Sequence, residues 1–383
     1  MRYLSAGESH GKGLVFIIEG FPSNVPININ EINQELSERQ KGYGRGKRMG
    51  IESDSVEIIS GIRGGKTLGS PIAMLIKNND WKNWEHGMSP ENPNQDPSLE
   101  ISQPRPGHAD LAGAIKYNHK DIRNILERAS ARETAMRTAT GAVAKQLLRQ
   151  FNIQIRHRVV SIGDIEDKPA LNRNINYWDT IQNSELSMYD RQAETKAKAL
   201  IDRSKAEGDT LGGIIEVSIE NVPIGLGSHV HYDRKLNAKL AMEIVGLQSV
   251  KGFEIGLGFD SSKAPGSKVH DEIYYDGQYR HKSNNAGGIE GGMSNGETIW
   301  FRAAVKPIPT LMRPLKSVDM KTKEVVDAIK ERSDVCAVPA AGVVMDNIAA
   351  WVIAQEMIIK FGGDSLEEMI KNYKTYCNYV KER

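Results

Sequence analysis

Segment 104–150 constrains this chain most, because it joins a rigid turn to a long apolar helix. Two prolines fix the backbone φ angle at its start, and Gly107 permits a tight bend after them. Further along, Ser130 and Glu133 have the spacing of a capping box, in which each side chain binds a free N–H of the first helical turn. Apolar residues then recur at helical spacing, at Met136, Ala139, Val143 and Leu147. We therefore predict a turn, followed by a helix that starts at Ser130.

The start of this helix is a candidate anion site. A helix N-terminus presents unpaired N–H groups and partial positive charge, which favour a phosphate. Arg128 and Arg132 flank it, and His108 lies in the preceding turn. The alternative is structural, because capping boxes start many ordinary helices and an arginine pair four residues apart is often a solvated face. Both interpretations stay open on this segment alone.

The rest of the chain mixes strands and helices without a regular βαβ alternation. Strands are predicted at 14–19, on both sides of a turn at 61–69 within 56–77, and at 153–162, 212–222 and 298–305. Helices are predicted at 29–40, 193–206, 233–245, 325–329 and 343–361, with a last helix from Asp364 or Ser365. Residues 78–104 are expected to form a long loop. We therefore predict an α+β fold in a single domain over residues 1–383.

Composition narrows the functional class. The 383 residues carry a net charge of +1, so no global charge attracts nucleic acid or a membrane surface. Cys336 and Cys377 are too few for a disulfide framework or a zinc site, and His229 and His231 lack a third candidate ligand. The N-terminus has no apolar signal segment, and no apolar run approaches the roughly 20 residues of a membrane helix. We expect a cytoplasmic protein with no metal site, no nucleic-acid partner and no membrane partner.

Two loops have compositions suited to anionic ligands. Residues 39–48 hold five cationic residues, three glycines and no acid. Like charges in a flexible loop repel each other, so this loop becomes favourable when an anion binds inside it, although a solvated or RNA-contacting loop is an equal alternative. The glycine-rich segment 284–296 lets the backbone approach a flat or phosphorylated ligand closely, although a long hairpin turn explains it as well.

The unusual residues taken together indicate a small polyanionic substrate. Guanidinium groups bind carboxylate and phosphate through paired hydrogen bonds, and so many loop arginines would be strange for a neutral ligand. His10 and His108 also lie in loops, and histidines among arginines suit proton transfer to or from such a substrate. From the residues alone we infer an enzyme that acts on a phosphorylated and carboxylated small molecule, with a phosphate-bearing cofactor left open.

Long motifs follow one another along nearly the whole chain, at residues 7–11, 104–110, 128–134, 284–296, 306–310 and 332–334. Together they resemble the chorismate synthase family. The resemblance implies a β-α-β sandwich with an internal pseudo-repeat, assembled as a homotetramer. It also implies the last step of the shikimate pathway, in which a carbon–oxygen lyase removes phosphate from 5-enolpyruvylshikimate 3-phosphate and yields chorismate. This 1,4-anti elimination requires reduced FMN without net redox change, because the flavin lends the substrate an electron and takes it back.

The resemblance also assigns roles to residues. His10 is expected to protonate the departing phosphate, His108 to protonate the reduced flavin, and Asp334 to help the flavin N5 atom take the C6 hydrogen. The expected substrate contacts are Ser9, Arg39, Arg45, Arg48, Arg105, Ser130, Arg132 and Arg332. The expected FMN contacts are Arg128, Ala129, Ser130, Gln248, Ser249, Gly291, Lys306, Pro307, Ile308, Pro309, Thr310 and Arg332. Arg39 and Arg45 are also expected to contact NADP, and whether the chain reduces its own flavin with NADPH stays open.

An RNA-binding protein that uses the basic loop 39–48 is the alternative function. The neutral net charge argues against it, because nucleic-acid binding depends on neutralising phosphates. The lack of an array of aromatic residues beside the loop argues against it as well, since single-stranded bases are bound by stacking.

Overall fold

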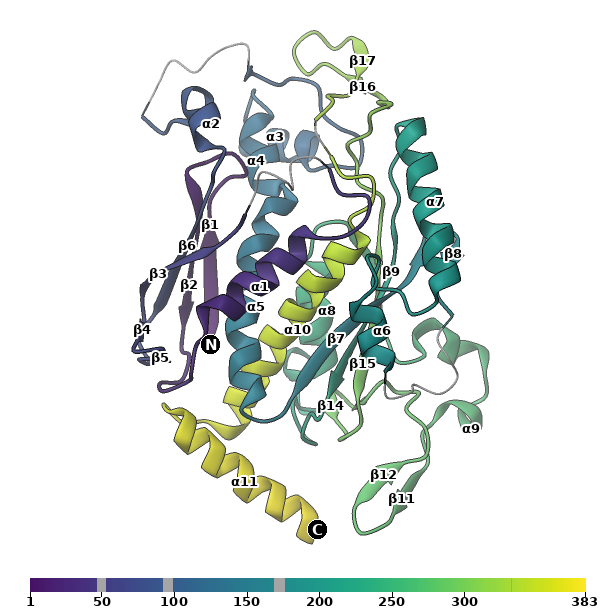
Figure 1. The fold of residues 1–383 in the computed structure, drawn as a ribbon. Helices are drawn as coiled ribbons and strands as arrows, with labels where there is room; N and C mark the ends of the chain where they lie inside the picture. The colour runs from purple at the N-terminus through teal and green to yellow at the C-terminus, as the bar shows by residue number, and fades with distance from the viewer. Residues whose placement is uncertain (47–52, 92–98, 169–175, 332) are drawn as a thin grey trace.

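The computed structural model describes residues 1–46, 53–91, 99–168, 176–331 and 333–383. In these ranges the chain forms two antiparallel sheets with a layer of helices between them (Figure 1). Helix α10 (Val338–Phe361) packs on α5 (Thr134–Arg149) and on the second sheet, and α5 packs on the first sheet. The predicted α+β class and β-α-β sandwich are confirmed, and the internal pseudo-repeat stays a prediction.

The first sheet has the strand order β1-β2-β6-β3, formed by Arg2–Ala6, Gly13–Glu19, Ile72–Lys77 and Val56–Ser60. Its strands alternate in burial because only one face packs on the helices. Phe16 and Ile18 of β2 are fully buried under the helices, whereas Val15 and Ile17 are each 42% exposed on the other face. The small hairpin β4–β5 (Ile62–Arg63 and Lys66–Thr67) occupies the turn predicted between the two strands of 56–77.

The second sheet has the strand order β10-β15-β9-β7-β8, formed by Val250–Ile255, Ile299–Val305, Gly213–Glu220, Gln154–Ile162 and Ile165–Glu166. Strands β15, β9 and β7 match the predicted strands to within two residues. Ile299, Phe301 and Ala303 of β15 are buried, and the residues between them are partly exposed. This sheet also faces the helical layer with one side.

The helical layer consists of α1 (Ile29–Gln40), α5, α8 (Leu236–Val245) and α10. Helices α5 and α10 cross so closely that a Cβ on Gly141 would lie 2.1 Å from the carbonyl oxygen of Asn347, so glycine is required there. Helix α10 has 24 residues, and an 18-residue window in it has a mean hydropathy of 1.4, enough to cross a membrane, but 78% of that window is buried inside the protein. The expectation that no apolar run reaches that length is therefore wrong, and the apolar character of α10 follows from its central position.

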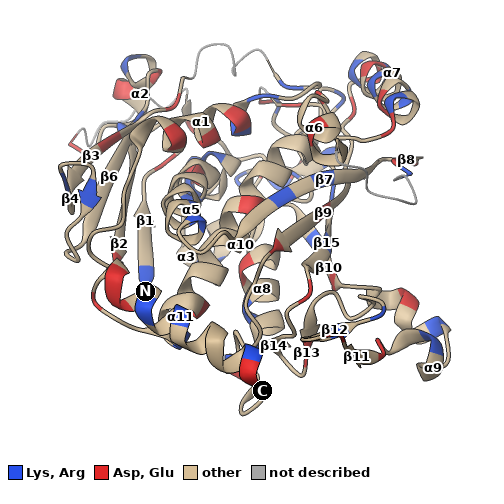
Figure 2. Cartoon of the chain, turned by 60° about the horizontal axis from the view of Figure 1, so that its bottom comes forward, with Lys and Arg blue, Asp and Glu red and all other residues tan. Residues whose placement is uncertain are grey.

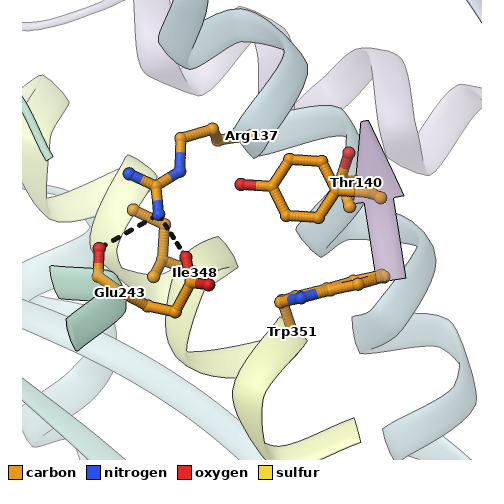
Figure 3. Close-up of a pocket in the computed structure, with 6 residues that line it drawn as sticks. Arg137, Thr140, Glu243, Ile348 and Trp351 are labelled. Carbon is orange, nitrogen blue, oxygen red and sulfur yellow. Dashed lines mark hydrogen bonds and ion pairs between the residues drawn. The ribbon is translucent and has the colours of Figure 1, made fainter. Parts of the chain in front are cut away.

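A narrow pocket with polar lining lies where α5, α8 and α10 meet (Figure 3). It is lined by Tyr3, Arg137, Thr140, Glu243, Ile348 and Trp351. Arg137 donates to the carboxylate and to the backbone carbonyl of Glu243, at 2.6 and 3.0 Å. Burial raises the pKa of the Tyr3 hydroxyl, although the nearby Arg137 opposes this effect. The Arg137–Glu243 ion pair links α5 to α8 inside the helical layer.

Two predicted segments have a different structure. Residues 81–88 form helix α2 (Trp81–Met88) inside the predicted loop, where Asp80 accepts hydrogen bonds from Asn83 and Trp84 in the first turns. Residues 325–329, predicted as a helix, instead contain strand β17 (Val325–Asp327), which pairs with β16 (Lys316–Val318). The β-branched residues of 325–326 favour a strand once a partner strand is present.

The long helix of segment 104–150 begins later than predicted. Helix α5 starts at Thr134, and the Ser130 hydroxyl accepts from the N–H of Arg132, which caps a short 3₁₀ turn at Ala131–Glu133. The Glu133 carboxylate accepts from Gln248 at 3.3 Å and does not close the predicted capping box. A capping box does form at Ser365, where the last helix, α11 (Leu366–Glu382), begins as predicted.

A second, smaller core lies beside the start of α5. Helices α3 (Asp110–Tyr117) and α4 (Arg123–Ala129) pack around Ile122 and Leu126. The β16–β17 hairpin joins this core, because the Ser317 hydroxyl donates to the carbonyl of Pro104. Figure 1 shows these elements at the same end of the molecule as α2. This small core fixes both sides of the turn at 105–110.

Candidate active site

His10 lies in the loop between β1 and β2, where the chain meets α4. Its backbone N–H and its ring Nδ1 both donate to the carboxylate of Glu127, at 2.8 and 2.9 Å. Burial raises the pKa of this carboxyl, but the hydrogen bonds from His10 lower it more, so the net pKa lies below its usual range. The loop histidine predicted from the sequence is therefore held by a buried acid.

Asn78 fixes the path of the same loop. Its side-chain amide donates to the carbonyls of Ser9 and Gly11, at 3.3 and 2.9 Å. The Ser9 N–H donates to the backbone carbonyl of Glu127 at 3.1 Å. The Ser130 hydroxyl donates to that of Ser9 at 3.3 Å, which joins this loop to the start of α5.

Helix α2 covers His10 from another side. The indole ring of Trp84 stacks on the imidazole with 4.0 Å between ring centroids and a tilt of 37°. The guanidinium of Arg123 lies 5.0 Å from the same indole ring and donates to Glu127 at 3.2 Å. An indole face attracts a cation, so Trp84 helps to keep Arg123 beside the acid.

His108 has the same type of partner. Its Nδ1 hydrogen-bonds to Asp110, which is fully buried and also accepts from Arg105 Nε at 2.9 Å. Arg105 also donates to the Thr310 hydroxyl at 3.0 Å, and Lys306 donates to the carbonyl of Gly107. These contacts connect the turn at 105–110 to the predicted flavin segment 306–310.

Two predicted substrate arginines share one buried acid. Arg132 binds Asp54 through both terminal nitrogens, the longer bond being 2.7 Å. Arg39, at the end of α1, lies 3.7 Å from the same carboxylate and donates to the Thr134 hydroxyl and the Ala131 carbonyl, at 2.8 and 3.0 Å. The two guanidinium groups are therefore positioned around the 3₁₀ turn that precedes α5.

The basic loop is described up to residue 46 and rests on the rest of the protein. Arg45 forms an ion pair with Asp334 at 2.8 Å, and the Gly46 N–H donates to the same carboxylate at 2.6 Å. The Tyr43 hydroxyl donates to Asp202 of helix α7 (Arg191–Glu207) at 2.8 Å. The structure thus brings Arg45 and Asp334, two of the predicted site residues, into contact.

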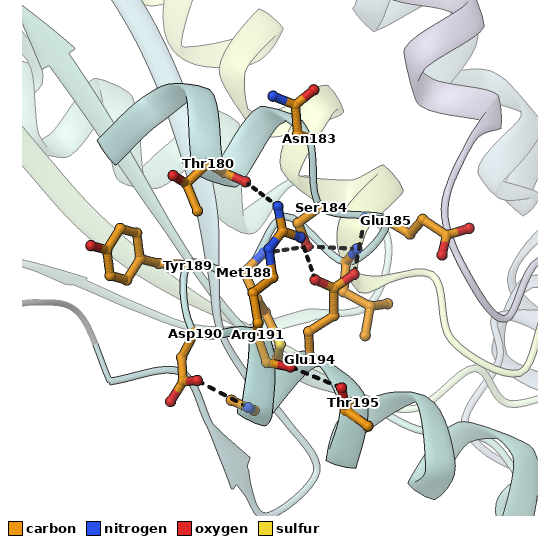
Figure 4. A network of polar contacts seen from close by, with 12 residues as sticks. Thr180, Asn183, Ser184, Glu185, Met188, Tyr189, Asp190, Arg191, Glu194 and Thr195 are labelled. Carbon is orange, nitrogen blue, oxygen red and sulfur yellow. Dashed lines mark hydrogen bonds and ion pairs between the residues drawn. The ribbon is translucent and has the colours of Figure 1, made fainter. Parts of the chain in front are cut away.

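A polar network at the N-terminus of α7 supports this loop (Figure 4). Glu194 accepts from Arg191 at 2.7 Å and from the backbone N–H of Glu185 at 3.2 Å. The carbonyl of Glu185 then accepts from the N–H of Tyr43 at 3.3 Å. Lys198 bridges the two glutamates, at 2.5 Å from Glu185 and 3.1 Å from Glu194. Acids on α7 therefore hold the start of the basic loop.

Most of the predicted flavin residues form a continuous group around the start of α5. The Lys306 N–H donates to the carbonyl of Ser249 at 2.9 Å, and Gln248 donates to Glu133 at 3.3 Å. Burial lowers the pKa of the Lys306 ammonium, and Lys251 adds to this effect. The side-chain oxygen of Gln248, Oε1, is buried and has no hydrogen-bond partner within the described ranges. Such an acceptor fits a ligand that carries N–H or O–H donors, as a flavin ring and its ribityl chain do.

Gly291 lies apart from this group within one chain. It sits in the turn between β13 (Ile289–Glu290) and β14 (Met293–Ser294), and the next carbonyl, of Gly292, accepts from the first N–H of α8. Gln248 follows the opposite end of α8. A helix of 10 residues is roughly 15 Å long, so about that distance separates the two positions.

The other predicted residues are placed as follows. Arg128 donates to the carbonyls of Ser5 and Gly7 and so holds the end of β1, and Ala129 ends α4. Segment 307–309 follows β15, where the Ile308 carbonyl accepts from the Thr210 hydroxyl at 2.8 Å. Arg48 and Arg332 lie outside the described residues.

The sequence interpretation missed the acids that position these cations. Asp54, Asp110 and Glu127 are each at most 8% exposed, and none of them was a candidate. A local signal exists for two of them, since Asp110 follows His108 by two residues and Glu127 follows Arg123 by one helical turn. Asp54 has no such signal, because its partner Arg132 is 78 residues away.

Comparison with known proteins identifies the family. The family model described as chorismate synthase matches residues 1–358. The chain is 56% identical over 384 residues to the chorismate synthase of Caldanaerobacter subterraneus subsp. tengcongensis, covering 100% of this chain and 99% of that protein. The chain belongs to the chorismate synthase family. It is also 53% identical to the chorismate synthase of Geobacter sulfurreducens, with coverage of 100% and 99%. A crystal structure of chorismate synthase superposes with a TM-score of 0.81 at 42% identity, covering 100% and 98% of the two chains.

Membership of the chorismate synthase family settles the activity. The chain is a lyase of the shikimate pathway and serves aromatic amino-acid biosynthesis, as the sequence motifs predicted. The RNA-binding alternative has no support from these comparisons. Figure 2 shows acidic and basic residues interspersed along the ribbon of the described chain.

Proposed function

We propose that the side chains gathered around the start of α5 carry out the phosphate elimination. The observation that supports this most is the chain of contacts from Ser9 through Ser130 to Arg132 and Glu133, and on through Gln248 and Lys306 to the turn of His108. It joins segments from five parts of the sequence into one site.

In this proposal the arginines bind the substrate, which carries two carboxylates and a phosphate. Arg132 and Arg39 already face one another across Asp54, so their guanidinium groups are oriented before the substrate arrives. Bidentate hydrogen bonds suit both carboxylate and phosphate oxygens. His10 donates a proton to the departing phosphate, as a general acid. Asp334, which is ion-paired with Arg45, assists the removal of the C6 hydrogen.

We propose reduced FMN as the cofactor, held by the group around Gln248, Ser249 and segment 306–310. The buried, unpaired Gln248 Oε1 and the partly buried Lys306 ammonium fit its polar atoms and its negative charge. When bound, reduced FMN supplies transient electron density to the substrate without net oxidation. His108, fixed by Asp110, is the proton donor on the cofactor side. Contacts of Arg39 and Arg45 with NADP stay predictions.

We also propose a homotetramer. The outer face of the first sheet exposes a patch of apolar residues on paired strands: Leu4, Ala6, Val15, Ile17, Ala73 and Leu75. Ion pairs at its edges, Arg2–Glu19 at 3.2 Å and Lys77–Glu57 at 2.7 Å, carry both signs, which suits contact with a second copy of the same face.

We further propose that the chain is one domain that works in the cytoplasm. One hydrophobic core includes residues of both sheets and of all four helices of the middle layer. The curated relatives are bacterial biosynthetic enzymes that the chain matches over its whole length.

The proposed reaction is tested by an anaerobic incubation with 5-enolpyruvylshikimate 3-phosphate and reduced FMN. We expect equal amounts of chorismate and phosphate, and no product when FMN is left oxidised. Formation of phosphate without chorismate would show a simple phosphatase and refute the elimination. Product formed without flavin would refute the cofactor assignment.

A further inference from the structure

The carboxylate of Glu127 is surrounded by donors. One oxygen accepts from the His10 N–H at 2.8 Å, and the other accepts from Arg123 at 3.2 Å. The His10 Nδ1 lies 2.9 Å from both oxygens. Glu127 is 2% exposed and its pKa is lowered, despite burial, by the hydrogen bonds from His10. An ionised carboxylate only accepts hydrogen bonds, so the Nδ1 atom must carry a proton.

This geometry fixes both the tautomer and the orientation of the imidazole. The backbone and the ring of His10 bind the same carboxylate, so rotation about the side-chain bonds would break a buried hydrogen bond. With Nδ1 committed, Nε2 is the nitrogen that gains and loses the catalytic proton. A neutral imidazole in solution has no such constraint.

Glu127 is itself held from two sides. Arg123 donates through Nε to the carbonyl of Leu99 at 3.0 Å, which anchors its guanidinium between that segment and the acid. Trp84 covers the same guanidinium, and its indole N–H donates to Asp80 at 3.1 Å. Helix α2 and the small second core therefore keep the carboxylate in place.

We propose that Glu127 is the positioning residue of the phosphate-releasing step, holding His10 as the Nδ1–H form so that Nε2 delivers the proton; this rests on the proposed function. For this step the imidazole carries a proton on both ring nitrogens. The C3–O bond breaks and its electron pair leaves with the phosphate, while the C6 hydrogen leaves as a proton and the electron pair of the C6–H bond completes the new diene. A phosphate oxygen takes the Nε2 proton, and the ring becomes neutral with its Nδ1 proton retained. Glu127 stays ionised throughout.

His108 is held in the same way as His10. Its Nδ1 also bonds to a buried acid, Asp110, which also binds Arg105. Arg105 Nη2 lies 3.1 Å from the same Nδ1, and because a guanidinium only donates, Asp110 must accept from both groups. Each of the two site histidines is thus held through Nδ1 by a carboxylate that an arginine shares.

The first test is spectroscopic and does not depend on turnover. Solid-state ¹⁵N NMR of histidine-labelled protein, without ligands and at pH 8, reports which ring nitrogen of His10 is protonated, with His10→Gln identifying the signal. We expect the Nδ1–H form in the natural protein, and a shift toward the Nε2–H form in Glu127→Gln. An Nε2–H form in the natural protein would overturn the proposal, even if Glu127→Gln failed to fold.

The second test measures the reaction. We expect Glu127→Gln to lose roughly tenfold to a hundredfold in kcat with KM nearly unchanged, the scale seen when the carboxylate partner of a metal-bound histidine is removed. Glu85→Gln, an exposed acid next to Trp84, is the control and should keep its rate. A kcat of Glu127→Gln within twofold of the natural protein would overturn the proposal. If the natural protein forms no chorismate, the proposed function fails, and the NMR result separates that failure from this one.

Discussion

At the scale of single residues, the cations of the site are held by buried acids. Asp110 is the clearest example, because it is fully buried and binds both His108 and Arg105. Burial raises the pKa of its carboxyl, but the hydrogen bonds from His108 and Arg105 lower it more, so the net pKa lies well below its usual range. A carboxylate that ionises more readily in the folded state than in the unfolded chain stabilises the fold.

We predict a pH-dependent cost for Asp110→Asn. The folded pKa is depressed, so the stabilisation by Asp110 is complete above the unfolded pKa of about 3.9 and declines as the pH falls below it. Thermal unfolding should show the variant melting lower at pH 7, with the difference shrinking below about pH 4. A difference in melting temperature that stays constant from pH 7 to pH 3 would contradict the ionised, paired Asp110.

His108→Ala should lose most of the turnover. With saturating substrate and reduced FMN we expect a fall of roughly a hundredfold or more, the usual scale of general-acid catalysis, because the ring is the proposed proton donor. His119→Ala, an exposed histidine after α3, is the matched control and should keep its rate. Near-normal turnover in His108→Ala would refute its role, although the family assignment would stand.

At the scale of elements, the helices of the middle layer are joined by polar contacts as well as by apolar packing. The Arg137–Glu243 pair links α5 to α8, and Arg137 is 7% exposed while the pair lines the pocket of Figure 3. Removing one partner of a buried pair leaves the other charge without compensation, which costs more than the pair contributes.

Arg137→Met should therefore destabilise the protein by about 2–4 kcal/mol. This cost is slightly lower than that of breaking a fully buried pair, because Glu243 is partly exposed. Urea unfolding measures the change. The control is Arg156→Met, which removes a partner of a surface pair at 3.9 Å from Glu220 and should cost at most about 0.5 kcal/mol. Equal costs for the two variants would show that the internal pair has no special role.

At the scale of the whole molecule, the outer face of the first sheet exposes apolar side chains. The first sheet leaves Leu4 74% exposed and Val15 and Ile17 each 42% exposed. A contiguous apolar patch with a charged rim is typical of a protein interface, which is why we assign this face to subunit contact.

Ile17→Glu should break up the proposed assembly. A charge at the centre of a buried interface loses its hydration, so we expect light scattering to show a lower mass than the natural protein, approaching the 42.4 kDa of one chain. Val325→Glu, at an exposed position of β17, is the control and should leave the mass unchanged. An unchanged mass for Ile17→Glu would place the interface elsewhere.

The sequence by itself determined the helices and strands that have a regular spacing of apolar residues or that depend on contacts between residues close in the chain. The helix at 29–40 has the predicted bounds, and the alternation of Ile72, Met74 and Ile76 matches the one buried face of β6. The motif residues that carry the family resemblance were also readable directly, because they are consecutive. The spacing of apolar residues and the residue types of turns depend on a few neighbouring residues, so they can be interpreted before the fold is known.

Only the tertiary structure decided which acid serves which cation. Glu127 meets His10 across 117 residues, and Asp54 meets Arg132 across 78, so no spacing rule links them. Helix α2 likewise forms where its composition suggested a loop, because Trp84 packs on His10 and Arg123. A buried carboxylate is stable only when donors from several elements converge on it, and that convergence exists only after the chain has folded.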